Sequence, residues 1–260
     1  MEDIYEEMIT VSQAIAATFP SPRFYSCCAA SLEFSRALFA EDPQVGKCRE
    51  MAFRELRDNF GHGMAHAEKV AVEAGALAYL EGSRLSLQDS SRRGASTLAQ
   101  IAGLLHDLRR GEKDHGQVSA AAAAPLLVEL GTSPGQSRYI VEAIANHEAF
   151  IEPRRIDSTV GQIISDALYD ADKFRWGPDN FTLTLWQMLR FSQAPIGRLI
   201  HRFPKGMRGI ARIKDTFRTE AGKIYGPEFI DLGLKIGEKI YQHQQERFTA
   251  ELSVEKNDGS

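Results

Sequence analysis

The sequence has few cysteines and no arrangement that would put them to use. Only three occur in 260 residues, and two of these, Cys27 and Cys28, are adjacent. This spacing fits neither a disulfide framework nor a Cys-x-x-Cys zinc site. No run approaches the roughly 18 apolar residues of a membrane span, and the acidic start from Met1 to Glu7 does not resemble a signal peptide. We therefore expect a protein of a reducing, cytoplasmic compartment with no membrane partner.

The sequence also lacks an excess of positive charge and a glycine-rich phosphate loop. The net charge is −4, which gives no whole-protein case for binding nucleic acid, so nucleic acid is not an expected partner. The apolar fraction of 43% and charged fraction of 25% are ordinary for a globular protein. No stretch alternates apolar and polar residues over a useful strand length, whereas helical spacing recurs along the chain. The predicted fold class is therefore all-α.

Helical periodicity and the position of proline divide the chain into four parts. Residues 1–57 predict a helical extension, 58–180 a helical core, 181–250 further helices packed on that core, and 251–260 a disordered polar tail. Within the core, the polar segment 82–96 predicts a long loop, with Thr97 capping the next helix. Pro125 predicts a kink or restart, because proline removes a helical hydrogen bond. Gly131 and Ser133-Pro134 predict a helix end and a helix start.

Several apolar helix faces of the core carry a histidine or aspartate where an aliphatic residue would be expected. For example, His147 continues the stripe of Ile140 and Ile144, and Asp172 lies four residues after Leu168. Buried polar groups of this kind need a partner, and a shared metal ion would compensate all of them together. The predicted metal ligands are His66, His106, Asp107, His147 and Asp172.

The ligand chemistry limits the choice of metal. A histidine and aspartate set without cysteine suits manganese, iron, cobalt, nickel or zinc, whereas magnesium is possible but prefers oxygen ligands. One or two ions could be held. A metal of this kind polarises a phosphoryl oxygen and lowers the pKa of a bound water, which creates a hydroxide nucleophile. Asp107 is predicted to orient that water as well as to bind the metal, which makes it a predicted catalytic residue.

Two further histidines are candidates for the chemistry. His115 and His62 could bind a second metal, act as a general acid or contact the substrate, and we assign His115 a catalytic role and His62 a substrate-binding role. Basic residues flank the ligands and could clamp phosphate oxygens, although each taken alone could equally be a surface charge. These predicted substrate-binding residues are Arg110, Lys113, Lys173 and Arg175.

The combined pattern resembles the HD superfamily of metal-dependent phosphohydrolases. The pattern consists of His66-x-x-Lys69-Val70, His106-Asp107, and Asp172 within Asp170-Ala171-Asp172-Lys173. The resemblance covers roughly residues 58–180 and implies an all-helical HD bundle in which His66, His106, Asp107 and Asp172 bind the catalytic metal. His115 and His147 are similar to the extra histidines of two-metal members. No Gly-Tyr-Pro signature follows His147, so a cyclic-dinucleotide phosphodiesterase is not indicated.

The resemblance implies a hydrolase that cleaves a phosphate ester of a nucleotide or another small phosphorylated metabolite. Two alternatives remain open: a di-iron oxygenase on the same scaffold, and a non-catalytic nucleotide-sensing or interaction module. The sequence does not decide between a monoesterase and a diesterase, and a homo-oligomer is possible. The basic stretch from Arg190 to Lys223 is compatible with a phosphate-attracting wall, a partner surface or a solvated face.

Overall fold

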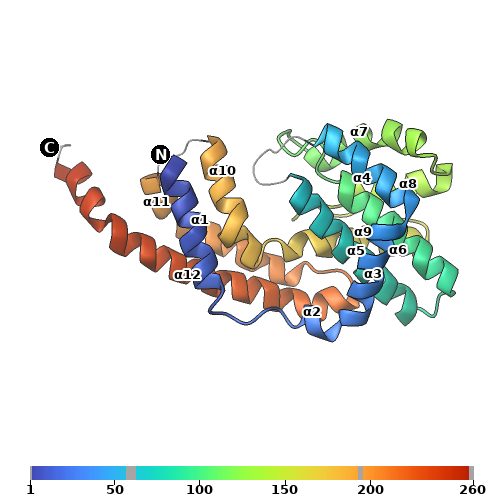
Figure 1. Ribbon diagram of the computed structural model, residues 1–260, viewed down its shortest axis with the longest axis horizontal. Coiled ribbons are helices and arrows are strands. Elements are labelled where there is room, and N and C mark those ends of the chain that lie inside the picture. The colour runs from blue at the N-terminus through green and yellow to red at the C-terminus, as the bar shows by residue number, and fades with distance from the viewer. Residues whose placement is uncertain (1, 57–62, 193–195, 258–260) are drawn as a thin grey trace.

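The chain folds entirely into helices in the part that the structure describes. A computed structural model describes residues 2–56, 63–192 and 196–257, and it contains no strand in those ranges (Figure 1). The predicted all-α class is therefore confirmed. None of the helices in these ranges combines the length and apolar composition that a membrane crossing demands.

A core lobe is built around four helices. They are α5 (Met64–Arg84), α6 (Asp89–Leu105), α8 (Pro134–Ala145) and α9 (Thr159–Phe174). Helix α5 packs against both α6 and α9, and α8 packs against α6 and α9. Around them lie α3 (Ala29–Glu41) on α5, α4 (Pro43–Glu55) on α6 and α7 (His115–Leu130) on α8. The buried aliphatic stripes of these helices form one continuous core, as the helical spacing of the sequence predicts.

A second lobe joins the two ends of the chain. It contains α1 (Glu2–Ala16), η1 (Asn180–Thr184), α10 (Leu185–Ser192), α11 (Ile196–Ala211), η2 (Arg212–Asp215) and α12 (Glu220–Asn257), as Figure 1 shows. Helix α1 packs against α10 and α12, whereas α3 and α4 pack on the core lobe. The segment 1–57 is thus divided between both lobes by the short helix α2 (Phe24–Cys27). Helix α12 runs to Asn257, past residue 251, where the sequence predicts disorder.

An aromatic cluster and one buried carboxylate connect the lobes. Phe174, at the end of α9, stacks on Phe229 of α12 with ring centroids 4.2 Å apart, and Phe24 of α2 packs edge-on to Phe174. Asp170 of α9 accepts hydrogen bonds from the backbone and hydroxyl of Thr219, just before α12 begins. Burial raises the pKa of Asp170 to about 7 although these donors oppose the shift. The last turns of α9 are therefore held from the C-terminal side.

The segment predicted as a loop over 82–96 is mostly helical. Helix α5 continues through Gly82 to Arg84, and α6 begins at Asp89, eight residues before Thr97. Ser96, at the end of this segment, is buried and donates from its hydroxyl to the carbonyl of Gly75, whereas Ser90 and Ser91 are exposed although they are helical. The prediction was wrong because a polar composition indicates contact with water and does not distinguish a loop from the solvated face of a helix.

Pro125 lies inside α7 without ending the helix. Its ring is on the exposed side of the helix, as is Ala121, whose carbonyl loses its helical partner and can bind water. The predicted helix boundaries that follow are confirmed. Gly131 ends α7 in the left-handed region with φ 77°, and Ser133 starts α8 with a capping box that it shares with Gln136.

Gly103 sets the spacing between α5 and α6. A Cβ atom at this position would lie 2.6 Å from the Cα of Ala71, so only glycine allows the two helix backbones to approach this closely. This approach brings the first turn of α5 next to the last turn of α6. The residues that protrude there are the ones predicted to bind metal.

Candidate metal centre

Histidines and aspartates from four helix ends meet in one buried cluster. His66 lies in the first turn of α5, His106 follows the last residue of α6, His147 lies two residues beyond α8, and Asp172 is in the last turn of α9. Asp107 follows His106. His106 and His147 are fully buried, and Asp107 and Asp172 are 3% and 4% exposed. The convergence predicted from the sequence is therefore present, and these residues could hold a metal ion.

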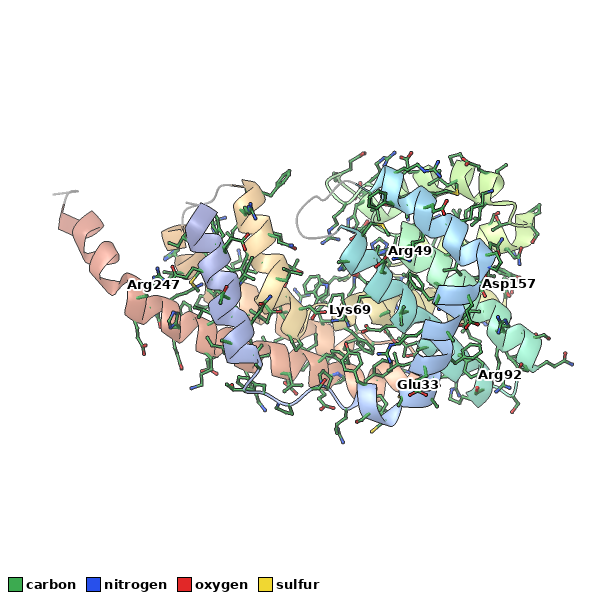
Figure 2. All side chains as sticks on the ribbon, viewed as in Figure 1. Glu33, Arg49, Lys69, Arg92, Asp157 and Arg247 are labelled. Atoms are coloured by element: carbon green, nitrogen blue, oxygen red, sulfur yellow. The ribbon has the colours of Figure 1, made fainter. Side chains whose placement is uncertain are left out.

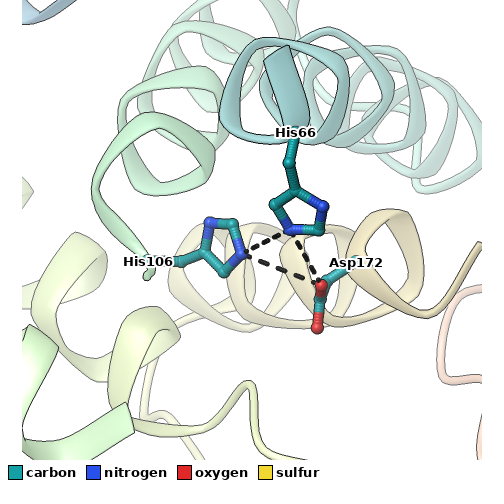
Figure 3. Close-up of side chains that lie close together, drawn as sticks. All are labelled: His66, His106 and Asp172. Carbon is teal, nitrogen blue, oxygen red and sulfur yellow. Dashed lines mark hydrogen bonds and ion pairs between the residues drawn. The ribbon is translucent and has the colours of Figure 1, made fainter. Parts of the chain in front are cut away.

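One group of potential ligands consists of His66, His106 and Asp172 (Figure 3). The Nε2 atoms of the two imidazoles are 3.3 Å apart, and the Oδ1 atom of Asp172 lies 3.5 Å and 3.7 Å from them. A tetrahedral ion with bonds of about 2.0–2.1 Å separates its ligand atoms by about 3.3–3.4 Å. The three atoms thus have the spacing of three corners of a metal coordination shell.

Backbone carbonyls fix the tautomers of the two innermost histidines. The Nδ1 atom of His106 donates to the carbonyl of Gly103 at 2.8 Å, and the Nδ1 atom of His147 donates to the carbonyl of Ile144 at 2.6 Å. In the neutral ring both bonds leave Nε2 as the nitrogen without a proton, which is the form that binds metal. The buried Nε2 atom of His147 makes no hydrogen bond to any described residue. Such an atom fits a metal ligand better than a satisfied core histidine.

Asp107 lies between two groups of imidazoles. Its Oδ2 atom is 3.4 Å from Nε2 of His106 and 3.8 Å from Nε2 of His66. Its Oδ1 atom is 3.4 Å from Nε2 of His147 and 3.8 Å from Nε2 of His115. Each oxygen of one carboxylate therefore faces a different pair of nitrogens. This is the arrangement of a carboxylate that can bridge two ions.

The cluster is electron-rich, and the pKa values reflect this. Burial disfavours a charged His106, but the carboxylates of Asp107 and Asp172 outweigh burial and raise the pKa of this imidazole to about 10. Burial also opposes the ionisation of Asp172, but Lys173, His106 and His66 hold the pKa of its carboxyl well below the usual range. The cluster therefore attracts a positive charge, which a divalent metal would supply in place of a proton.

His115 and Arg110 lie at the outer edge of the cluster. The guanidinium of Arg110 donates to Nε2 of His115 at 2.7 Å and lies 3.9 Å from Oδ1 of Asp107. Burial, His147 and Arg110 together lower the pKa of His115 to about 4. The ring is therefore neutral near pH 7, which suits a metal ligand or a base. The predicted role of general acid would require a nearby phosphate that raises this pKa.

Glu148 is a member of the site that the sequence analysis overlooked. Its Oε2 atom lies 3.5 Å from Nδ1 of His115, and its Oε1 atom accepts from the backbone N–H of Gly116 at 2.8 Å. It thereby ties the start of α7 to the residue after His147. The dipeptide His147-Glu148 parallels His106-Asp107, and this repetition is the signal that could have identified it.

Two predicted phosphate-binding residues are engaged inside the protein. Lys173 is 2% exposed, and its ammonium group contacts the Oδ2 atom of Asp172. Arg175 is 5% exposed and contacts Glu73 and Asp179. Lys173 in the last turn of α9 and Arg175 directly after α9 are both buried, and both contact carboxylates of the protein, of which Asp179 is partly exposed.

The other predicted substrate-binding residues differ in position. Arg110 lies at the cluster. Lys113 is exposed on the turn before α7 and makes no hydrogen bond or ion pair with the described residues of the cluster. His62 lies outside the described residues.

A cleft of about 570 Å³ opens beside His66. Its polar lining includes Lys69, Arg175 and Asp179, and its apolar lining includes Phe53 and Leu183. The Nζ atom of Lys69 lies 2.8 Å from Oδ2 of Asp179 and remains partly exposed. Figure 2 shows Lys69 at the junction between the two lobes. Lys69 follows His66 by three residues, so helical spacing places both on one face of α5 and could have identified it.

Comparison with known proteins identifies no relative. No family model, curated protein or solved structure matches the chain.

Proposed function

We propose that the protein is a metal-dependent phosphohydrolase of the HD type that cleaves a phosphate ester of a small metabolite by means of metal-activated water. The observation that supports this most directly is the burial of three tightly spaced acceptor atoms, from His66, His106 and Asp172, at the meeting point of α5, α6 and α9. Burying so many acceptors is unfavourable unless a cation lies between them.

The geometry suggests which residues would hold each of two ions. His106 offers only one free nitrogen, because its Nδ1 atom is bonded to Gly103, so two ions cannot share it. His66, His106 and Asp172 would hold the first ion. His147 and Asp107 would hold a second, and His115 could join them if its Nε2 atom exchanged the hydrogen bond from Arg110 for the metal. Metals in this position would polarise the phosphoryl oxygen and acidify water.

The protein's own groups supply the remaining functions. The Oδ1 atom of Asp107 can accept a hydrogen bond from a water molecule and orient its lone pair towards phosphorus. Arg110, which is partly exposed at the same edge, can contact a phosphate oxygen with its guanidinium. Lys69 lines the adjacent cleft and can neutralise a second anionic group. With these roles, the phosphate would lie near Arg110 and the rest of the substrate would extend into the cleft lined by Lys69.

A di-iron oxygenase is the second candidate, because two ions, one beside His66 and one beside His147, would meet its requirement for two metals. The flanking cations favour the hydrolase, because Arg110 and Lys69 suit an anionic substrate. Iron-specific absorption in the purified protein, together with oxygen consumption and no release of phosphate, would support the oxygenase.

The decisive experiment combines metal analysis with a substrate screen. The purified protein should contain one or two transition-metal ions per chain and should release phosphate from at least one phosphorylated metabolite when manganese is supplied. Asp107→Ala should abolish that turnover, whereas Arg93→Ala, at an exposed cation of α6 outside the cluster, should keep it. Full activity of Asp107→Ala would overturn the proposal. Turnover absent from the whole panel, while one ligand still raises the Tm, would instead support a non-catalytic sensor.

A further inference from the structure

Helix α11 carries a concentrated positive charge that the metal centre does not use. The segment Ile196–Lys214 contains six lysine and arginine residues and no acidic residue, although the chain as a whole has a net charge of −4. Four of these cations have exposed side chains and form no ion pair with any described residue. They are Arg202, Lys205, Arg208 and Arg212, which we call the basic stripe.

The basic stripe lies on one side of the helix. At about 100° per residue, positions 202, 205, 208 and 212 fall within an arc of about 120°. Neighbouring positions three or four residues apart are about 5–6 Å from each other on a helix surface. The opposite side of α11 is apolar, and its residues Leu199, Phe203 and Ile210 are buried where α11 packs against α12. Three of these cations therefore lie on one side of α11, and Arg212 follows them at the start of η2.

The basic stripe ends at an exposed aromatic ring near the metal centre. The guanidinium of Arg212 lies over the ring of Phe150, 4.5 Å from its centroid. Phe150 is 49% exposed and has a φ of 65°, an unusual conformation for an aromatic residue. It follows the predicted ligand His147 by only three residues, and the exposed Arg154 lies further along the same loop. Cations in a row and an accessible aromatic face are thus adjacent.

We propose that the basic stripe and Phe150 bind a single-stranded nucleic acid. A row of cations tracks a phosphate backbone, and an aromatic ring held beside it can stack with an unpaired base. The net charge of the whole chain does not reveal this surface, because the acidic residues that balance its positive charge lie elsewhere in the sequence. The inference goes beyond the proposed hydrolysis of small esters, since it assigns the second lobe a ligand of its own.

An anionic membrane is the competing partner, and the geometry argues against it. Helices that lie on membranes insert an apolar face into the lipid and keep the charged face towards water. In α11 the apolar face is already buried in the protein, so it cannot insert. A duplex is also less suited, because its bases are stacked on each other and unavailable to Phe150.

The test measures binding of labelled 20-nucleotide oligo-U and oligo-dT by fluorescence anisotropy over a series of salt concentrations. Four phosphate contacts predict a slope of about −3 in a plot of log K against log salt for a single strand. Arg202→Glu, Lys205→Glu and Arg208→Glu combined should weaken binding at least tenfold and reduce the slope by about 2. The matched control reverses three exposed cations outside the stripe, Arg36, Arg93 and Lys235, and should change binding less than twofold.

The other outcomes are also decisive. Phe150→Ala should weaken binding to both oligonucleotides without altering the salt slope, and unchanged binding would remove the stacking part of the proposal. Comparison of oligo-U with oligo-dT distinguishes RNA from DNA as the ligand. Equal losses in the stripe and control variants, no binding at 50 mM salt, or binding to phosphatidylserine vesicles in place of oligonucleotides would overturn the proposal. Metal content and Tm should match the wild type in the stripe variant, so failure here is separable from failure of the metal centre.

Discussion

Helices α5 and α9 contribute to two buried polar clusters, which differ in how their buried charged groups are compensated. One is the metal-ligand cluster around His66 and Asp172. The other is an ion network in which Arg175 contacts Glu73 and Asp179 and donates to the hydroxyl of Tyr25 at 3.3 Å. Both take charged groups out of water, at positions less than three turns apart on each helix.

The two clusters differ in how charge is balanced. In the Arg175 network, the guanidinium is matched by the carboxylates of Glu73 and Asp179, and Tyr25 donates to Glu73 at 2.8 Å. The metal-ligand cluster has two carboxylates, the buried cation Lys173, the partly exposed Arg110 near Asp107, and four imidazoles. In the network the guanidinium donors face carboxylate oxygens, whereas the cluster brings the Nε2 atoms of several imidazoles together with carboxylate oxygens, an arrangement that an added cation would stabilise. This difference in donors and acceptors, and not burial alone, distinguishes a structural ion network from a candidate metal site.

The largest expected effect comes from removing the bridging carboxylate. Asp107→Ala should lower kcat by at least about 1000-fold, which corresponds to about 4 kcal/mol, because it removes a ligand and the group that orients water. Metal content should fall in parallel when measured by mass spectrometry of the purified protein. A variant that retained both ions and full turnover would place the chemistry elsewhere. Circular dichroism would confirm that the variant is folded.

Breaking the ion network should affect stability and leave the metal in place. Arg175→Met leaves Glu73 buried without its partner, so the free energy of unfolding should fall by about 3–5 kcal/mol. The double variant Glu73→Leu with Arg175→Met removes both charges and should recover much of the loss. Urea unfolding measures the free energy of unfolding of both variants. The amount of bound metal should stay at the wild-type level in each. Loss of metal from Arg175→Met would show that the two clusters are coupled.

Removal of metal should destabilise the wild type by a smaller amount. At a free metal concentration 100 times Kd, a bound ion contributes about 2.7 kcal/mol to the free energy of unfolding. A chelator should therefore lower the Tm by about 5–10 °C for a chain of this size. The Tm of Asp107→Ala should hardly respond to the same chelator. A wild-type Tm that changes neither with the chelator nor with added manganese would argue against a metal in the cluster.

The smallest effect is expected at the second ion. His147→Ala should reduce the metal content by one ion per chain while His66, His106 and Asp172 keep the first. Activity should fall about tenfold or more, and Tm should change less than on full chelation. If the wild type holds only a single ion, His147→Ala should leave the metal content unchanged, and Asp107 would then be a ligand to one ion only.

The sequence predicted the composition of the metal-ligand cluster because its signal is local. Each ligand replaces an aliphatic residue on a helical stripe, so periodicity alone indicates that it points inward. The same logic was not applied to Lys173 and Arg175, which are also buried and which the sequence analysis predicted to bind substrate phosphate. Whether a buried cation faces a carboxylate depends on partners over 100 residues away, as with Arg175 and Glu73, and sequence spacing does not reveal such pairs.

The helix boundaries show a similar limit. Gly131 and Ser133 act through their own backbone and neighbouring residues, so their effect could be predicted. The helical state of residues 89–96 depends on packing against α5, where Ser96 finds the carbonyl of Gly75. The assignment of α1 to the second lobe depends on contacts with α10 and α12, near the other end of the chain. Local sequence patterns predict individual helices, whereas contacts between residues far apart in the sequence decide which helices pack together.

The position of the ligands at helix ends has a consequence for the order of events. Helices α6, α8 and α9 all terminate at the cluster, at Leu105, Ala145 and Phe174. Each C-terminus carries a partial charge of about −0.5 from its aligned peptide dipoles. The N-termini of α5 and α7 also lie there and offset part of this charge, but three C-termini and two carboxylates leave an excess that favours a cation. If the proposed hydrolase is correct, a cation should therefore bind before a phosphate ester does, and the supply of metal would control the activity.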